Sequence, residues 1–448
     1  MTNLRTPPGP KVLFPLGLLL AFRNNPIAFL NRMTAEFGNN VYFKAGSRRI
    51  YFLNTPESAQ DILVTHQNSF QKGLGLRRTK NLLGEGLLTS EGDLHLRQRR
   101  MIQPMFHRQR IAGYADTMVS LGERIASSWQ NGSTVDMHAE MSHLTMLIVA
   151  KTLFDIDIDT QRDSDELSDA VTTLITSFFS TLGPLAELRL RLPLPSSKRL
   201  LAARTQMETA IQAMIAERRN GEDHDDLLSM LVAAQDSEDH NRRMSDKQVR
   251  DEVLTLFLAG HETTANALAW TFYLLSQNPE ATCNLHKELD RVLAGRSPTY
   301  ADLEKLPYTR MVLSEAMRLY PPAWILTREA LEDVEVGGYL LPKGATALVC
   351  QWVIHHDACY YPQPLKFDPQ RWTPDQVAAR PKMSYIPFGG GARLCIGEPF
   401  AWMEGTLLLA TLAQRWEMSL EAGFPVEPLA QITLRPKYGM KMQLKKWA

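Results

Sequence analysis

Cysteine is scarce in this chain, and a net charge of either sign is absent. The four cysteines in 448 residues form no CxxC pair and no zinc-finger spacing, and they are too few for a disulfide framework. A reducing compartment suits them best, so we expect a cytoplasmic protein. Lys plus Arg and Asp plus Glu number 49 each, which gives no electrostatic case for nucleic acid or an anionic membrane as a partner.

Long hydrophobic runs are also lacking. The apolar run from Val12 to Phe22 is broken by Pro15 and Gly17, and it is shorter than the roughly 20 apolar residues that span a bilayer. We therefore expect no stable membrane insertion, with weak association through residues 13–22 as a minor alternative. Hydrophobic residues at 44% and charged residues at 22% are typical of a globular protein. The length suits two or three average domains or one large catalytic domain.

Glycine and one cysteine are concentrated between Phe388 and Ala401. Three consecutive glycines, residues 389–391, allow backbone conformations closed to other residues and let a flat ligand approach the main chain. Cys395 stands just before an expected helix with Pro399 in its first turn. The helix has apolar residues spaced for one buried stripe: Phe400, Met403, Leu407 and Ala410. A helix N-terminus favours negative charge, so this cysteine is placed to be a metal-binding thiolate.

Taken alone, such a cysteine is more often a buried residue before a packed helix. The whole stretch, however, resembles the haem-binding loop of the cytochrome P450 superfamily, whose pattern is Phe, two free positions, Gly, one free, Arg, one free, Cys, one free, Gly. Its fixed positions are filled by Phe388, Gly391, Arg393, Cys395 and Gly397. In that family the cysteine is the axial thiolate of the haem iron. Phosphate-loop readings fail, because residues 389–397 lack both the Lys-Ser/Thr of a Walker A loop and GxGxxG spacing.

The resemblance implies a mainly helical α+β fold, with haem b (iron protoporphyrin IX) held between a long central helix and the cysteine loop. We expect one haem-thiolate monooxygenase domain over residues 1–448. Residues 1–40 would be a proline-rich opening and first helix, and residues 41–448 the catalytic core. We find no internal repeat and no fused reductase.

The N-terminal half alternates short strands and helices. The pattern predicts a hairpin over residues 41–44 and 50–53. It also predicts that a helix begins next, with Thr55 as its N-cap and Pro56 in its first turn. Residues 71–93 read as a long glycine-rich loop of the kind that shapes binding sites. Residues 115–219 are mostly helical in pattern, with a break between helices around Phe178 to Leu185. The polar run over residues 220–246 reads as a surface connection.

The helix that begins at His95 places that residue and Arg99 one turn apart. By itself the run is a solvated basic face, but in the family a Trp or His and an Arg with this spacing bind a haem propionate. Arg328 and Arg393 match further propionate positions. Arg108 and Arg110 add to a local basic patch suited to an acidic electron-transfer protein.

The longest helix begins at the capping box Ser245 with Gln248 and continues to Gln277. Apolar residues point all around it, so we expect burial, and a buried acid and hydroxyls cost several kcal/mol unless satisfied or used. Thr263 can bond a carbonyl one turn back. Residues 259–264 resemble the family's oxygen-activation motif, with Glu262 and Thr263 as the acid and alcohol; the other interpretation is a helix bend. A zinc-protease site is excluded, because Ala265 stands where a second His is needed.

Glu315 and Arg318 lie at i, i+3 on a helix over residues 307–320. The family buries this pair and adds a downstream arginine, here Arg371, so we assign the three to structure. Residues 323–326 are expected to run extended past the haem edge. Residues 334–341 read as a hairpin, 347–353 as a strand, and 432–434 with 440–444 as a final hairpin.

Family placement puts ten mostly apolar side chains beside the substrate: Leu82, Leu83, Leu87, Leu256, Ala259, Ala323, Trp324, Ile325, Tyr438 and Met440. We therefore expect a monooxygenase that inserts one atom of O2 into a C–H or C=C bond of a lipophilic small molecule such as a terpenoid, polyketide or other secondary metabolite, or alternatively a fatty acid. Electrons would come from NAD(P)H through a separate ferredoxin or flavodoxin and its reductase, to a monomer.

Three other functions remain as alternatives. A peroxide-driven relative would carry Arg-Pro in place of Glu262-Thr263, a haem sensor or carrier would need no proton relay, and a cysteine hydrolase would need a histidine base near Cys395. Substrate identity and the redox partners cannot be read from the residues.

Overall fold

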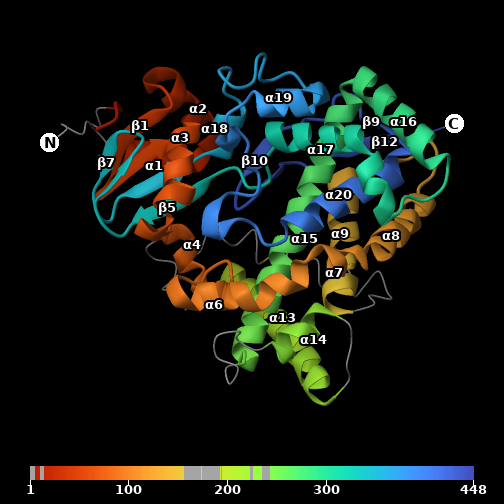
Figure 1. The fold of residues 1–448 in the computed structure, drawn as a ribbon, viewed down its shortest axis with the longest axis horizontal. Helices are drawn as coiled ribbons and strands as arrows, with labels where there is room; N and C mark the ends of the chain where they lie inside the picture. The colour runs from red at the N-terminus through yellow and green to blue at the C-terminus, as the bar shows by residue number, and fades with distance from the viewer. Residues whose placement is uncertain are drawn as a thin grey trace. The chain divides into compact units, whose positions relative to one another are not determined.

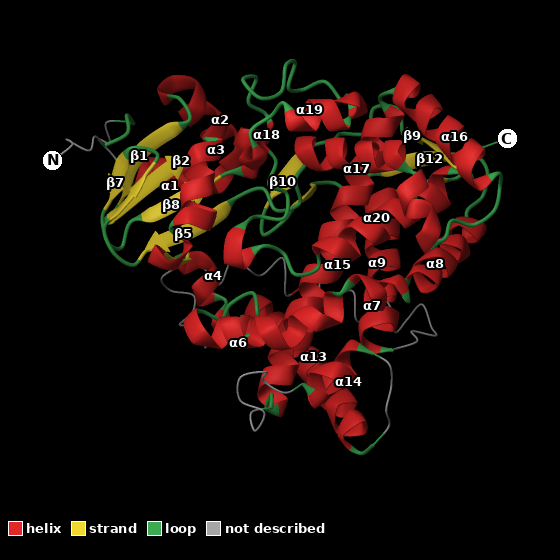
Figure 2. Cartoon of the chain, in the orientation of Figure 1, coloured by secondary structure: helices red, strands yellow, loops and turns green. Residues whose placement is uncertain are grey.

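The fold is described from a computed structural model, which covers residues 6–10, 15–155, 173, 192, 194–221, 226–234 and 243–447. The chain divides into two compact units. Unit 1 comprises residues 1–74, 314–395 and 428–435, and unit 2 comprises residues 75–313, 396–427 and 436–448. Figure 1 follows the chain by colour, and Figure 2 separates the strands, in yellow, from the more numerous helices. The expected break at 178–185 lies outside the described residues.

Unit 1 contains most of the strands. Its five-stranded sheet has the order β1-β2-β8-β5-β3, with β2 and β8 parallel and the other neighbours antiparallel. The strands of the sheet are β1 (Asn40–Ala45), β2 (Arg48–Leu53), β3 (Phe70–Lys72), β5 (Leu326–Ala330) and β8 (Thr346–Val349). A separate hairpin joins β6 (Val334–Val336) to β7 (Tyr339–Leu341). Both hairpins expected from the sequence, over residues 41–53 and 334–341, are confirmed.

The helices of unit 1 are short. They are α1 (Pro15–Asn24), α2 (Pro26–Phe37), α3 (Pro56–Gln60), the π-helical turn η1 (Asp61–Thr65), η2 (Gln67–Ser69), α18 (Gln351–His355), η5 (Pro369–Trp372), α19 (Pro374–Ala378), η6 (Lys382–Ser384) and η7 (Gly391–Arg393). The Thr55 hydroxyl accepts from the Ser58 N–H at 3.2 Å, so the expected cap of α3 is confirmed.

Unit 2 is mainly helical. Its helices are α5 (Lys80–Leu83), α6 (Gly92–Ile102), η3 (Gln103–Phe106), α7 (Arg108–Ala112), α8 (Ala115–Ser128), α9 (Met137–Phe154), α13 (Pro195–Arg219), α14 (Leu227–Ala233), α15 (Asp246–Ser276), α16 (Pro279–Leu293), η4 (Tyr300–Lys305) and α20 (Glu398–Ala413). A three-stranded antiparallel sheet has the order β4 (Thr134–Asp136), β12 (Lys441–Lys446), β9 (Trp416–Leu420). Helices α4 (Leu74–Arg78) and α17 (Pro307–Leu319) contain residues of both units.

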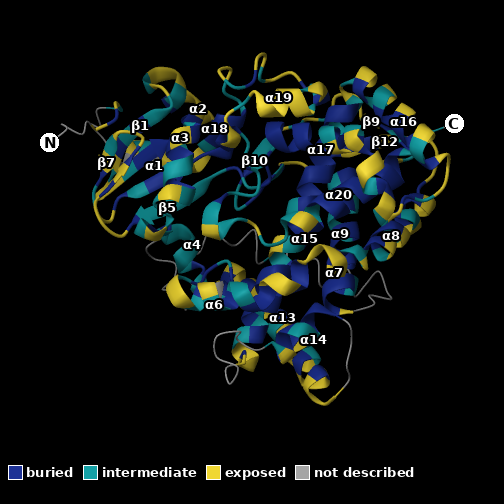
Figure 3. Cartoon of the chain, in the orientation of Figure 1, coloured by how far each residue is buried: buried dark blue, intermediate teal, exposed yellow. Residues whose placement is uncertain are grey.

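Helix α15 forms where the sequence predicts it. Its N-cap Ser245 and Gln248 make the reciprocal bonds of a capping box, and Pro279 begins the next helix. Apolar side chains all around α15 are buried, and α9 and α20 of the same unit are almost as fully buried, as the dark blue ribbons of Figure 3 show. Within the described ranges, no helix combines the length and the apolar character needed to span a bilayer.

Two predicted loops contain helices. Residues 71–93 begin in β3 and include α4 and α5, each too short to leave a periodic pattern in the sequence. Residues 220–246 include α14, which is capped by the Asp226 carboxylate accepting a hydrogen bond from the Ser229 N–H at 2.6 Å. The leucines of this helix, Leu227, Leu228 and Leu231, are buried. In the sequence, the capping residue Asp226 followed by leucines could have indicated this helix.

Two predicted strands also differ. The strand expected over residues 347–353 ends at Val349, because the Cys350 N–H bonds the Asn54 side chain at 2.7 Å and α18 follows. The expected final hairpin is wrong: residues 434–436 form β11 (Leu434–Pro436), which pairs with β10 (Pro428–Ala430), whereas β12 lies between β4 and β9. Strand β11 thus pairs with its near neighbour β10, whereas the partner of β12 on one side, β4, is distant in the sequence.

Candidate active site

The cysteine loop of unit 1 is a tight turn anchored on η1 and η2. The Cys395 N–H donates to the Phe388 carbonyl at 3.0 Å, and the Ala392 N–H donates to the Gln67 side chain at 2.6 Å. Gly391 has φ +65°, and a Cβ on it would lie 1.7 Å from the Leu63 carbonyl oxygen. Only glycine satisfies both conditions, so the glycine of the motif has a steric cause.

Cys395 itself is exposed. Helix α20 begins three residues later at Glu398 with Pro399 in its first turn, and the predicted stripe of Phe400, Met403 and Leu407 is buried. The expected order of loop, cysteine and packed helix is confirmed. Gly397 caps α20 with φ −84°, a conformation open to any residue, so the backbone does not explain that glycine.

The predicted propionate ligands occupy defined elements in each unit. In unit 1, Arg393 lies in η7 and Arg328 in β5, where its guanidinium donates to the Thr327 carbonyl at 3.0 Å. In unit 2, His95 and Arg99 lie one turn apart on α6. His95 is buried, so a fully solvated basic face is not the environment of this helix.

The basic patch carries less free charge than the sequence suggests. The exposed guanidinium of Arg108 donates to the Glu304 carboxylate and to the Tyr300 hydroxyl, each at 2.7 Å. Docking of an acidic electron-transfer protein at this patch stays a prediction. Arg108 would contribute less to it than Arg110, because Arg108 is already paired with Glu304.

Helix α15 carries the acid and the alcohol of the predicted motif. Glu262 is buried, and the Thr263 hydroxyl donates to the Ala259 carbonyl at 2.8 Å, the local bond that the sequence indicates. Ala259 is exposed, although the residues of α15 just before and after this turn, 251–257 and 264–272, are buried. Burial lowers the pKa of His261 to about 4, so its ring is neutral at physiological pH and adds no charge beside Glu262.

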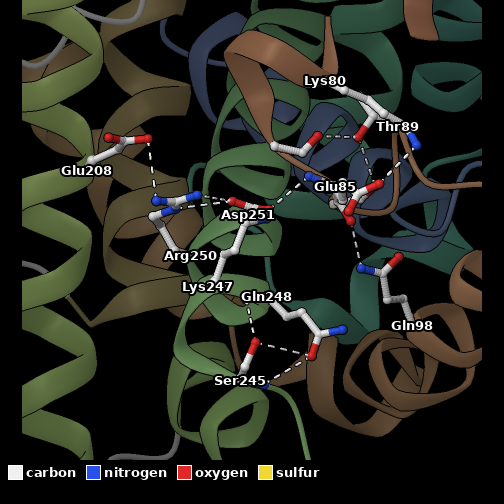
Figure 4. A network of polar contacts seen from close by, with 12 residues as sticks. Lys80, Glu85, Thr89, Gln98, Glu208, Ser245, Lys247, Gln248, Arg250 and Asp251 are labelled. Atoms are coloured by element: carbon white, nitrogen blue, oxygen red, sulfur yellow. Dashed lines mark hydrogen bonds and ion pairs between the residues drawn. The ribbon is translucent and has the colours of Figure 1, made fainter.

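A polar contact that was not predicted from the sequence holds the segment before α6 against α15 (Figure 4). The Glu85 N–H donates to the Asp251 carboxylate, and the Leu87 N–H donates to the Glu252 carboxylate, each at 2.8 Å. The Gln98 amide of α6 donates to the Glu85 carbonyl at 2.7 Å. The two adjacent acids in an apolar helix were the sequence signal.

This contact sets the environment of the unit 2 pocket candidates. Leu83, Leu87 and Leu256 are buried, and α5 includes Leu82. Met440 is fully buried, and its N–H donates to the Asp136 carboxylate at 2.9 Å. These positions are apolar as expected, while their contact with a substrate stays a prediction.

Other pocket candidates differ in exposure. In unit 1, Ala323 and Ile325 are half-buried, but Trp324 is 3% exposed, packs among core residues and donates to the Gln431 carbonyl at 2.9 Å. That environment favours a structural role for Trp324. In unit 2, Tyr438 is 47% exposed.

The three residues assigned to structure are brought together in unit 1. The Glu315 carboxylate receives the Arg318 guanidinium at 2.8 Å, and the Arg371 Nε lies 3.3 Å from it. Both members of the first pair are fully buried, and Arg318 also donates to the His355 carbonyl. A buried, fully bonded pair fixes chain segments and leaves no group free for chemistry.

The donor set fits a haem. An exposed cysteine sulfur before a helix N-terminus is a soft ligand for iron, and the glycine turn that holds it has no room for a side chain at Gly391. In unit 1, Arg393 of η7 and Arg328 of β5 are cations of the kind that bind carboxylates such as propionates. Among the described residues no cluster of three or more His, Cys, Asp or Glu offers a competing metal site.

Comparison with known proteins agrees with this class of haem-thiolate site. The family model described as Cytochrome P450 matches residues 7–443. The chain is 39% identical to Cyclooctatin synthase of Streptomyces melanosporofaciens, over 93% of this chain and 91% of that protein. It is 37% identical to Cyclooctat-9-en-7-ol 5-monooxygenase of the same organism, over 90% and 87%, and 34% identical to Pentalenene oxygenase of Streptomyces avermitilis, over 94% and 92%.

The chain therefore belongs to the cytochrome P450 family. The expected mainly helical α+β fold and the expected monooxygenase class are confirmed. Haem iron and O2 follow from membership of the family.

Proposed function

We propose that this enzyme oxidises a cyclic terpenoid by inserting one atom of O2 into a C–H or C=C bond. The observation that carries the proposal is the similarity, over about nine tenths of the chain, to proteins named for cyclooctatin, cyclooctat-9-en-7-ol and pentalenene. The apolar candidates Leu83, Leu87 and Leu256 support a lipophilic substrate, because burying apolar surface is the main favourable term in binding such a molecule.

In this proposal Cys395 binds the haem iron, and four side chains bind the propionates: His95, Arg99, Arg328 and Arg393. Phe388 and Gly391 shape the loop that presents the cysteine. The haem, when bound, supplies the binding and reductive activation of O2. We infer that both units belong to one catalytic domain, since the family match runs through both of them.

Glu262 and Thr263 hold and move the protons that the reaction consumes. The Thr263 hydroxyl donates to the Ala259 carbonyl, which leaves its oxygen lone pairs free to accept a hydrogen bond from water on the exposed face of α15. Glu262 precedes it on the helix and provides an exchangeable proton from a buried position. His261, neutral and bonded within the helix, does not compete for that proton.

Electrons are proposed to come from NAD(P)H through a separate ferredoxin or flavodoxin with its reductase, to a monomeric cytoplasmic enzyme.

The test is a titration of the purified holoprotein, in which the spin state of the iron is followed by its Soret absorbance. The panel contains cyclic terpenes, steroids, macrolides and graded fatty acids at matched concentrations. We expect a saturable low-to-high-spin shift with cyclic terpenes and none with fatty acids of similar carbon number. A shift confined to fatty acids or macrolides would refute the terpenoid assignment while leaving the haem site in place.

A further inference from the structure

Two adjacent acids, Asp251 and Glu252, are buried in the second turn of α15, and the proposed chemistry gives them no role. Their exposed fractions are 1% and 0%, and the neighbouring Val253 and Leu254 are buried and apolar. Successive residues of a helix point about 100° apart, so the two carboxylates face different directions. Burying a carboxylate is costly unless it receives donors, so the donors show what each acid does.

The donors include backbone N–H groups of the turn Gly84–Ser90, which belongs to the same unit. The Glu85 N–H donates to Asp251 and the Leu87 N–H donates to Glu252, each at 2.8 Å. Hydrogen bonds to an ionised acceptor are roughly twice as strong as neutral ones. Two acids of α15 therefore hold this turn at two points of its main chain.

Two glycines let the turn lie directly on α15. Gly84 has φ +72°, and a Cβ on it would lie 2.2 Å from the carboxyl carbon of Asp251. A Cβ on Gly86 would lie 2.2 Å from the Thr255 hydroxyl oxygen and 2.5 Å from the Asp251 carbonyl oxygen. The close approach is thus an observation separate from the hydrogen bonds, and it leaves no room for a side chain at either glycine.

The turn is also closed on itself and tied to α6. The Thr89 N–H donates to the Gly86 carbonyl at 2.9 Å, and the Thr89 hydroxyl donates to the Gly84 carbonyl at 2.7 Å. The Gln98 amide of α6 donates to the Glu85 carbonyl at 2.7 Å. Because its parts are bonded to one another, the turn moves away from α15 only if the bonds to the two acids break.

Asp251 connects a further helix to the turn (Figure 4). Its carboxylate also receives the Arg250 guanidinium at 2.7 Å and the Lys247 ammonium at 3.0 Å. The Arg250 guanidinium in turn lies 3.6 Å from the Glu208 carboxylate of α13. A substitution of Asp251 would disturb all these contacts, so Glu252 is the better position at which to test the hold on the turn.

The turn carries one of the apolar side chains expected beside the substrate. Leu87 is buried, and Leu256 lies one helical turn after Glu252 on the same face of α15. An apolar wall fixed through its main chain keeps one shape. A rigid cyclic molecule that fits this shape loses little internal freedom on binding, whereas a flexible chain must be ordered against it.

We propose that Asp251 and Glu252 are positioning residues that fix the Gly84–Ser90 turn on α15 and thereby make the enzyme prefer rigid cyclic molecules to flexible chains. The preference rests on the proposed function and on the expected contact of Leu87 and Leu256 with the substrate. The hold on the turn depends on neither.

The first experiment is hydrogen exchange of the full-length, substrate-free holoprotein, followed by mass spectrometry in peptides that cover residues 85–90. Glu252→Leu removes the acceptor at similar volume, and Glu252→Gln keeps an acceptor oxygen. We expect exchange about tenfold faster, or more, in Glu252→Leu and close to the wild-type rate in Glu252→Gln, because a hydrogen bond to a charged group is worth at least a factor of ten. Equal exchange in the wild type and Glu252→Leu would overturn the proposal.

Glu288→Leu is the matched control. The Glu288 carboxylate is also buried, and it accepts the Tyr308 N–H and the Thr309 N–H, each at 2.8 Å. Its loss should speed exchange at residues 308–309 and leave residues 85–90 at the wild-type rate. Faster exchange at residues 85–90 in this control as well would reduce the effect to general destabilisation and overturn the assignment to Glu252.

A second variant keeps the test valid if Glu252→Leu does not fold. Gly86→Ala leaves both acids in place but pushes the turn away from α15, so exchange at residues 85–90 should again be faster. Gly113→Ala is its control, because the nearest atom to the added carbon would lie 3.3 Å away, and it should exchange like the wild type. Wild-type exchange in Gly86→Ala would contradict the close packing of the turn.

The positioning role is read from spin-state titrations with a cyclic terpene and a fatty acid of similar carbon number. The ratio of the two Kd values should fall several-fold in favour of the fatty acid in Glu252→Leu, and return to the wild-type value in Glu252→Gln. In turnover, Glu252→Leu should raise KM for the terpene more than it lowers kcat. An unchanged Kd ratio in Glu252→Leu would overturn the positioning role. Failure of the terpenoid assignment would be recognised separately, in the wild type alone, because the exchange result needs no substrate.

Discussion

A single methyl group at Gly391 should release the cysteine loop. Replacement by Ala imposes a left-handed conformation that costs about 1–2 kcal/mol for a residue with a Cβ. The added carbon would also lie 1.7 Å from the Leu63 carbonyl oxygen and 2.7 Å from the Gln67 amide oxygen, so the loop must move away from η1. Overpacking costs typically about 1–3 kcal/mol, and losing the Ala392 N–H bond to Gln67 adds about 1 kcal/mol.

The total for Gly391→Ala is therefore about 3–6 kcal/mol, concentrated in the loop that presents Cys395. Gly46→Ala is the matched control, since Gly46 has φ +63° with nothing within 4 Å of its Cβ position. It incurs the conformational cost of about 1–2 kcal/mol without the collision.

The assay is the haem-to-protein ratio and the ferrous–CO spectrum of both variants, with circular dichroism as the measure of folding. We expect Gly391→Ala to keep its helical signal but to lose most of its haem or its thiolate-type CO spectrum, and Gly46→Ala to retain both. If Gly391→Ala bound haem with the same CO spectrum as the control, the steric account of the loop would be refuted.

Three further predictions concern the helices. Thr263→Ala should lower the yield of product per NAD(P)H oxidised several-fold. Thr271→Ala removes the same kind of hydrogen bond to a carbonyl one turn back on α15 and should leave the yield unchanged, so equal yields for the two variants would contradict the relay role of Thr263. Arg318→Met removes the partner of the buried Glu315 carboxylate and should lower the free energy of unfolding, measured in urea, by about 3–5 kcal/mol. Arg108→Met breaks an exposed ion pair and should cause no measurable loss, so similar unfolding midpoints for the two variants would contradict this reasoning. Burial raises the pKa of Glu404 to about 8 in the native state, whereas the unfolded state releases this proton above about pH 4.5, so the free energy of unfolding should fall as pH rises between these values, by up to about 1.4 kcal/mol per pH unit. In urea titrations Glu404→Gln should flatten this slope, and parallel slopes for the two proteins would count against the raised pKa.

Features encoded within a few residues were predictable from the sequence. The capping box at Ser245, the cap at Thr55 and the hairpin over residues 41–53 form as expected, because each depends on contacts between near neighbours. The Cys395 bond to the Phe388 carbonyl and the Thr263 bond within α15 are local for the same reason, whereas the anchor of the cysteine loop on Gln67 is not.

Features that depend on distant partners could not be read in this way. Strand β12 pairs with β4, more than 300 residues earlier in the chain, and the Glu252 carboxylate meets the Leu87 N–H from 165 residues away. An apolar ring such as that of Trp324 suits a pocket wall and a core equally well, and its hydrogen bond to Gln431 was not visible in the sequence. The burial of Glu404 likewise follows only from the packing of α20.

The most direct test of the central claim is turnover under isotopically labelled O2, with the purified enzyme, surrogate redox partners and the terpene that gives the spin-state shift. The account predicts a product that contains one labelled oxygen atom, and no product from Cys395→Ser. A product whose oxygen comes from water, or an undiminished yield from Cys395→Ser, would contradict it.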